Sequence, residues 1–342
     1  MNIWVDLWAA PDPLFFRPIV KRLHAQGHTT WVTAREFGET VSIAEQSGFK
    51  FRVVGRHGGR TGAAKMAQIL MGAVQLAFLV GREKIDLAVS FNSYAQGLAA
   101  KWRGVPFVTC MDYEYQPANH LAFRLATRVI VPDGFDRATL RRQGGYPHKV
   151  VTFSGLKEHI SLADFCPDPS FRHELEPLGI TSNDILITMR PPATWATYHQ
   201  FENTLFDRIV VFLAGRPDIK ILLLPRSDSQ SAHFRELGME NLVIPPRVLD
   251  GLNLVYYSDM VISAGGSMNR EAVVLGTPAY SVFQGRMAGV DQKMIANGML
   301  HTLQSSDDLE RLSLSRKPRL PFRPIQSGAI DQVVHAIVGT AY

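Results

Sequence analysis

The sequence predicts an α/β protein with two Rossmann-like domains, whose parallel sheets face one another across a central cleft. Three observations support this prediction. Strand-like and helix-like segments alternate from the first residue, and such alternation is typical of parallel, doubly wound sheets. The alternation is interrupted once, near two prolines in FCPDPS (165–170), and then restarts. A chain of 342 residues is long for one hydrophobic core and sufficient for two.

In the first half, buried strands and amphipathic helices follow one another closely. Apolar residues from Phe15 to Leu23 recur on one face of a helix, which Gly27 ends. The run IDLAVS (85–90) is continuously apolar, as in strands buried on both faces. We expect strands at 3–7, 29–33, 49–54, 85–90, 105–110, 129–131 and 150–153. We expect helices at 14–25, 39–46, 63–80 and 94–102.

The second half repeats the pattern. We expect strands at 185–189, 219–224, 242–244, 260–263 and 279–283. We expect helices at 201–214, 230–237, between Gly266 and Gly276, and at 326–338. The predicted domains are an N-terminal Rossmann-like domain at 1–166 and a C-terminal Rossmann-like domain at 167–325. The segment 326–342 is expected to pack back on the N-terminal domain.

The stretch MVISAGGSMNREAVVLGTPAYSVF (260–283) is central to the functional prediction. Gly265 and Gly266 allow a tight turn and let a ligand approach the backbone. The turn leaves N–H groups free at a helix N-terminus, which is a natural site for an anion. Glu271 stands four residues after Ser267, whereas a capping box requires three. Two interpretations remain: an ordinary connection between strands, or a site for a hydroxyl-rich ligand.

Composition excludes several classes of protein. The net charge is +5 and the basic residues are dispersed, which does not indicate a nucleic-acid-binding protein. The two cysteines, Cys110 and Cys166, indicate neither a disulfide framework nor a thiolate metal site. There is no G-x-G-x-x-G after the first strand, no P-loop, no G-x-S-x-G and no H-E-x-x-H. We predict no metal and no cofactor. The pair of carboxylates that most resembles a metal site is Asp112 with Glu114.

The N-terminus lacks the features of a signal peptide, so we expect a cytoplasmic protein. The apolar segment 63–80 has two interpretations. It is either a helix buried on the sheet, which we favour, or a peripheral contact with the inner face of the membrane. Arg56, Arg60 and Lys65 would flank such a contact.

The segment GGSMNREAVVLGTPA resembles the donor-site motif of GT-B nucleotide-sugar enzymes. It is similar to that of the transferase that adds N-acetylglucosamine in peptidoglycan precursor synthesis, and more loosely to that of UDP-N-acetylglucosamine 2-epimerases. In such transferases a glutamate six residues after a glycine holds the ribose hydroxyls. Gly265 and Glu271 have this spacing here.

Nearly the whole chain also resembles a family of archaeal and bacterial GT-B-like proteins of unknown function. Members begin with a strand, a Pro-Pro-His loop and a Phe-Phe helix, and they share a GLKE segment, here GLKEHISLADFCPD. The sequence departs from this family pattern at one position. Where members often have a histidine in the loop, this chain has Asp12, in APDPLFF. A buried aspartate can act as a general base, or the residue simply begins the helix.

The resemblance implies that 1–166 is an acceptor-side domain and that 167–325 binds the nucleotide sugar, with a donor site at the ends of strands in this second domain. Arg190 and Arg226 follow two of these strands and are candidates for phosphate contacts. The base would lie near Ile244 to Leu249. The full set of predicted donor-site residues is Arg190, Arg226, Ile244, Leu249, Gly265, Gly266, Ser267, Asn269, Arg270, Glu271, Gln284, Asp291 and Gln292. The candidate catalytic residues are Asp12, Glu114 and Glu158.

The function that follows is a metal-independent glycosyltransferase. It would move a sugar from a UDP-sugar to a glycan or lipid-linked acceptor in cell-envelope polysaccharide or glycolipid synthesis. Two alternatives stay open: an isomerase related to the 2-epimerases, and a non-catalytic protein that binds a nucleotide sugar.

Overall fold

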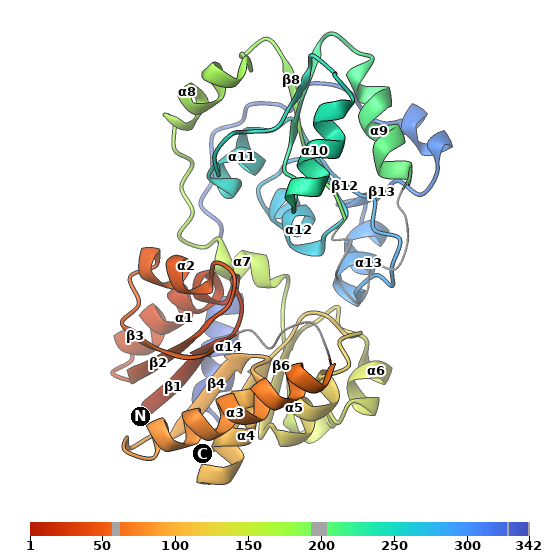
Figure 1. The fold of residues 1–342 in the computed structure, drawn as a ribbon. Helices are drawn as coiled ribbons and strands as arrows, with labels where there is room; N and C mark the ends of the chain where they lie inside the picture. The colour runs from red at the N-terminus through yellow and green to blue at the C-terminus, as the bar shows by residue number, and fades with distance from the viewer. Residues whose placement is uncertain (57–61, 193–203, 327, 341–342) are drawn as a thin grey trace. The chain divides into compact units, whose positions relative to one another are not determined.

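The computed structural model describes residues 1–56, 62–192, 204–326 and 328–340, and the chain forms two compact units (Figure 1). The first unit contains Met1–Asp164, Ala288–Val290 and the C-terminal residues from Ile325 onward. The second contains Phe165–Met287 and Asp291–Pro324. Each unit is an α/β fold built on its own parallel sheet.

The sheet of the first unit has the strand order β3-β2-β1-β4-β5-β6-β7, and every described pairing is parallel. Its strands are β1 (Asn2–Leu7), β2 (Thr29–Glu36), β3 (Phe51–Arg56), β4 (Leu87–Phe91), β5 (Phe107–Cys110), β6 (Arg128–Pro132) and β7 (Val150–Phe153). Its helices are α1 (Asp12–Ala25), α2 (Thr40–Gln46), α3 (Gly62–Val80), α4 (Tyr94–Arg103), α5 (Asn119–Leu125), α6 (Arg137–Arg142), α7 (Lys157–Ser161) and α14 (Ala329–Val338).

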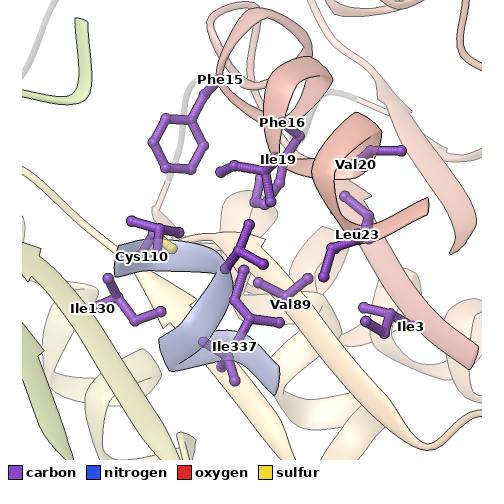
Figure 2. Packing of buried hydrophobic residues seen from close by; sticks show 14 of the residues in the cluster. Ile3, Phe15, Phe16, Ile19, Val20, Leu23, Val89, Cys110, Ile130 and Ile337 are labelled. Atoms are coloured by element: carbon purple, nitrogen blue, oxygen red, sulfur yellow. The ribbon is translucent and has the colours of Figure 1, made fainter. Parts of the chain in front are cut away.

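Helices pack on both faces of this sheet because its central strands are apolar on both sides. Figure 2 shows one face, where Phe15 and Ile19 of α1 and Ile337 of α14 pack against strand residues that include Val89 and Ile130. The other face carries α3 and α4 over Trp4. The C-terminal helix α14 therefore completes the core of the first unit.

The second unit has the strand order β10-β9-β8-β11-β12-β13, again parallel. Its strands are β8 (Ile185–Arg190), β9 (Ile219–Leu223), β10 (Leu242–Val243), β11 (Met260–Ser263), β12 (Ala279–Ser281) and β13 (His301–Thr302). Its helices are α8 (Phe171–Leu175), α9 (Thr204–Ala214), α10 (Asp228–Glu236), α11 (Gly251–Tyr257) and α12 (Gly266–Val274). Helix α13 (Gly289–Ala296) begins in residues of the first unit and continues in the second.

Local sequence explains several helix ends. Ser93 caps α4 by accepting a hydrogen bond from the N–H of Gln96, and Gly104 ends that helix with a φ of 66°. Asp250 caps α11 by accepting from the N–H groups of Leu252 and Asn253. Helix α12 differs, because Gly265 stands at its N-cap and none of the described side chains caps it. The first N–H groups of α12 therefore have no side-chain cap among the described residues.

The structure confirms the predicted fold class of two parallel-sheet α/β domains and corrects several boundaries. The strand predicted at 49–54 begins at Phe51, and the one predicted at 279–283 ends at Ser281. The start of the helix predicted at 201–214 lies outside the described residues. Short helices such as α6 and α13 were not predicted.

The prediction that segment 63–80 is buried on the sheet is correct for only one side of α3. Ala73 and Leu76 are buried in the core, whereas Met71 and Phe78 on the opposite side are exposed. No described helix combines the length and apolar content needed to cross a membrane.

Candidate functional site

Each sheet has one point at which the strand order reverses direction. In the first unit this point lies between β1 and β4, and in the second between β8 and β11. Ligands of open α/β sheets bind outside the carboxyl ends of the strands at such points. In the first unit the loop after β1 leads to Asp12, the first residue of α1, and in the second the turn after β11 contains Gly265. The fold therefore selects two of the predicted regions as candidate sites, which we describe separately.

Asp12 is a buried acid at the first of these points. It begins α1, and its Oδ2 accepts hydrogen bonds from the backbone N–H groups of Trp8 and Ala9, at 2.8 and 2.9 Å. Burial raises the pKa of Asp12 to about 7, although these hydrogen bonds and the positive charge of Lys157 lower it. A carboxyl group with a pKa near neutrality can both release and take up a proton.

Further charged groups lie close to Asp12. The Nζ of Lys157 is 2.9 Å from Oδ2 of Asp112 and 4.0 Å from Oε1 of Glu158. The side chains of all three are almost fully buried. The charge of Lys157 also lowers the pKa of Asp12, so the lysine interacts electrostatically with three carboxyl groups. We call Asp12, Asp112, Lys157 and Glu158 the acidic cluster. It includes two of the three predicted catalytic residues.

Glu114, the third predicted catalytic residue, connects loops of the first unit. It is fully buried, and its Oε1 accepts hydrogen bonds from the N–H groups of Asp136 and Gly289, at 2.9 and 3.0 Å. Its backbone carbonyl accepts from Gln143. The carboxylate therefore holds neighbouring backbone in place, an arrangement that spacing along the chain did not indicate.

A second buried acid, Asp6, was not among the predicted residues. It accepts hydrogen bonds from the hydroxyl groups of Ser93, at 2.5 Å, and Thr33. Burial raises its pKa. The signal in the sequence was an aspartate within the apolar strand NIWVDL. Lys157 was also missed, although it directly precedes Glu158 in GLKE.

In the second unit, two arginine side chains approach the glycine turn before α12. A Cβ atom placed on Gly265 would lie 3.0 Å from Nη2 of Arg226, and one on Gly266 would lie 3.3 Å from Nη2 of Arg270. Arg226 also donates from Nε to the carbonyl of Pro191, at 2.9 Å. The two glycines thus let two guanidinium groups come close to an uncapped helix N-terminus. This arrangement suits an anion with several oxygen atoms.

The structure pairs two residues that were predicted separately as ligand contacts. Arg270 donates from Nε to Oδ1 of Asp291 at 2.6 Å and from Nη2 to Oδ2 at 2.9 Å. Both residues are buried. Asp291 therefore holds the guanidinium of Arg270 in position beside Gly266.

The remaining predicted donor-site residues lie in different environments. Arg190 ends β8 and is half-buried, and its carbonyl accepts a hydrogen bond from the N–H of Ala264, just before the glycine turn. Asn269 is buried and donates to the carbonyl of Ser263. Ser267 and Glu271 are half-buried on α12. These four residues therefore lie on or beside the elements that form the turn.

Four others are less closely tied to the turn. Gln284 and Gln292 are exposed, and Gln292 donates to the carbonyl of Met287. Ile244 directly follows β10 and is half-buried. The side chain of Leu249 packs in the core beside Leu254, so at this position only the backbone is left to contact a base.

Comparison with known proteins decides the family. The model of a family described as "Protein of unknown function (DUF354)" matches residues 1–315. The chain belongs to this family. A relative from Methanocaldococcus jannaschii, the uncharacterized protein MJ0665, is 29% identical over 306 residues, which is 88% of each chain.

Two solved structures are similar to this DUF354 protein along almost the whole chain. One is the UDP-GlcNAc 2-epimerase of Methanocaldococcus jannaschii in complex with UDP-GlcNAc and UDP, with a TM-score of 0.72, 13% identity and 99% of both chains covered. The other is MurG of Acinetobacter baumannii, with a TM-score of 0.59, 14% identity and 99% of both chains covered. At these identities the likeness concerns the fold. It confirms the predicted GT-B-like architecture and the resemblance to both groups of enzymes.

Proposed function

We propose that this protein is an enzyme that acts on a nucleoside-diphosphate sugar, most simply a UDP-sugar. The observation that carries the proposal is the glycine turn before α12, where an uncapped helix N-terminus lies beside the guanidinium groups of Arg226 and Arg270. The N–H groups and the positive end of the helix favour a diphosphate, and guanidinium groups bind phosphate oxygens in pairs. The similarity in fold to an epimerase crystallised with UDP-GlcNAc and UDP supports the same ligand class.

The other donor contacts follow from the positions of residues around this turn. Glu271 stands in the second turn of α12 and is half-buried, so its carboxylate is suited to accept hydrogen bonds from ribose hydroxyls. The backbone from Ile244 to Leu249 is the proposed contact for the base. We propose Arg190, at the end of β8, as a further phosphate contact.

The first candidate reaction is sugar transfer to an acceptor hydroxyl. Transfer with inversion requires a base that removes the acceptor proton while the leaving diphosphate is stabilised. Asp12 is the proposed base, since burial brings its pKa to about 7. The guanidinium groups beside Gly265 and Gly266 would stabilise the charge that develops on the diphosphate.

The second candidate reaction is epimerisation of the sugar, and one observation favours it. The acidic cluster brings three carboxyl groups around Lys157, whereas the sequence alone did not reveal a set of acids in one place. Moving a proton off and onto a sugar carbon uses more than one such group. The TM-score to the epimerase is also higher than that to MurG.

A thermal-shift experiment tests the shared part of the proposal. UDP and UDP-GlcNAc should raise the melting temperature, because a ligand at about one hundred times its Kd adds ~2.7 kcal/mol of stability. Glu271→Ala should weaken this response, while Glu240→Ala, an exposed acid outside the site, should not. No response to uridine, guanosine, cytidine or thymidine diphosphate would refute nucleotide binding at this site.

Incubation of the protein with UDP-GlcNAc alone then separates the two reactions. An epimerase converts this substrate without an acceptor, and a transferase leaves the sugar unchanged. If UDP binds but neither reaction is found, and Asp12→Asn changes nothing, the protein is a non-catalytic nucleotide-sugar-binding protein.

A further inference from the structure

The outer side of α3 is an exposed apolar surface. Five large apolar side chains lie on this side and are 43–76% exposed, with Phe78 the most exposed. They are Met66, Leu70, Met71, Val74 and Phe78. We call these five residues the apolar stripe. The opposite side of the same helix, including Ala73 and Leu76, packs in the core against α4.

The stripe contributes little to the stability of the first unit, because its side chains remain largely in water. No charged residue occurs from 66 to 81, so four turns of the helix present only apolar and amide side chains. Contiguous apolar surface of this kind on a folded protein marks a binding surface. The inner side of α3 already accounts for the packing of the helix.

Positively charged residues surround the C-terminal end of the stripe. Arg82 and Lys84 follow α3 directly and are exposed. Arg103, at the end of α4, donates from Nη2 to the carbonyl of Gly81 at 3.4 Å. Arg52 on β3 lies 4.0 Å from Glu83, the only acid in the sequence from 66 to 84.

Trp102, which directly precedes Arg103 in α4, is 53% exposed. Tryptophan favours the boundary between water and lipid, because its ring is apolar and its N–H is polar. The end of α3 thus combines an apolar stripe with a basic rim, and the α4 residue next to one rim arginine is an exposed tryptophan.

The positive charge of the rim indicates which of two partners covers the apolar stripe, a second copy of the chain or a lipid surface. A second copy of the chain, packed through a two-fold axis, would present the same surface and the same basic charge. An anionic lipid surface instead carries charge that complements the rim. We propose that α3 lies in the plane of an anionic membrane surface, with the apolar stripe inserted among the lipids. This inference goes beyond the proposed function and does not depend on it.

The test is co-sedimentation of the full-length protein with phosphatidylcholine vesicles that contain or lack phosphatidylglycerol. We expect binding to the anionic vesicles that weakens as salt is added. Met71→Gln with Phe78→Gln should reduce the partition coefficient by at least about 10-fold, since two inserted apolar side chains are lost. Arg82→Gln with Lys84→Gln should reduce it by roughly 10-fold.

The matched control is Val248→Gln with Leu320→Gln. These side chains are 88% and 75% exposed and lie in the second unit, so their replacement should leave vesicle binding unchanged. Thermal unfolding of each variant shows whether the fold is retained. The measurement needs no substrate, so its result is separate from that of the nucleotide experiments.

Three outcomes would overturn the proposal. The first is an absence of binding to anionic vesicles by the wild-type protein. The second is equal binding by the wild type and the Met71/Phe78 variant, which would show that the net charge of the chain acts without the stripe. The third is a wild-type dimer that the same variant converts to a monomer, with no vesicle binding, which would identify a second copy as the occupant.

Discussion

Arg270 and Asp291 form a buried, two-point ion pair at the N-terminus of α12, with donor–acceptor distances of 2.6 and 2.9 Å. The pair joins α12 to the first turn of α13 and holds a guanidinium group 3.3 Å from the position of a Cβ atom on Gly266. It therefore has two roles that mutation can separate. One is structural, and the other is the positioning of positive charge at the proposed diphosphate site.

Arg270→Met should destabilise the protein by about 3–5 kcal/mol, because it leaves the carboxylate of Asp291 buried without its partner. The double variant with Asp291→Leu should recover most of this stability. Its affinity for UDP should nevertheless remain below that of the wild type, because the guanidinium group is absent. Urea unfolding and nucleotide titration measure the two effects. Arg311→Met, which removes an exposed pair with Asp308, should change stability by less than about 1 kcal/mol. A double variant with wild-type affinity would exclude Arg270 from the site.

Gly265→Ala should leave stability nearly unchanged and lower the affinity for UDP by about 10-fold. The backbone φ of −122° accepts alanine, and the new Cβ would lie 3.0 Å from Nη2 of Arg226, at the end of a flexible side chain, and in ordinary contact with Oγ of Ser263 at 3.7 Å. That guanidinium must move away, and the loss of one charged hydrogen bond reduces affinity by about this factor. Gly251→Ala, where a Cβ would meet no atom of the described residues within 4 Å, is the control. Isothermal titration of both variants tests the prediction, which fails if they bind UDP equally.

Asp12→Asn should remove part of the pH dependence of stability. The folded-state pKa of Asp12 is raised from 3.8 to about 7, so the folded protein holds a proton that the unfolded chain has released. The stability that this protonated carboxyl group contributes is fully present below about pH 4 and is lost as pH rises through about 7. Between pH 5 and 7 the wild type should therefore lose about 2 kcal/mol more stability than the variant. Urea unfolding across this range measures the difference, and parallel curves would contradict it.

Lys157→Met should destabilise the first unit, and the loss should increase with pH. The change leaves the buried carboxyl groups of Asp112 and Glu158 without the ammonium group, at a cost of roughly 3 kcal/mol when they are ionised. The loss should be smaller near pH 4, because the charge of Lys157 lowers the pKa of Asp12, which burial raises to about 7, and Asp12 is protonated at pH 4. Lys21→Met is the control, because Lys21 is 77% exposed and 4.0 Å from Asp164. Equal losses at pH 4 and pH 8 would argue against charge as the cause.

Long apolar runs were the part of the fold that could be predicted. The strands around IDLAVS and ILITM and the helix that carries Phe15 and Phe16 were found because their period and length are recorded in the sequence itself. Short elements were missed. Helix α6 has six residues, mostly polar, and β13 has two, which is too few to show a period.

Of the candidate site, the sequence indicated the glycine turn, and it indicated Arg226 and Asp12 as single residues. It could not show that Asp291 binds Arg270, that Lys157 lies between carboxyl groups, or that α3 leaves its outer side in water. The chemistry of one residue and the period of one element are local properties that sequence records. Which side chains meet, and which stay exposed, depends on how distant elements pack, so only the tertiary structure decides a buried ion pair, a raised pKa or an apolar surface.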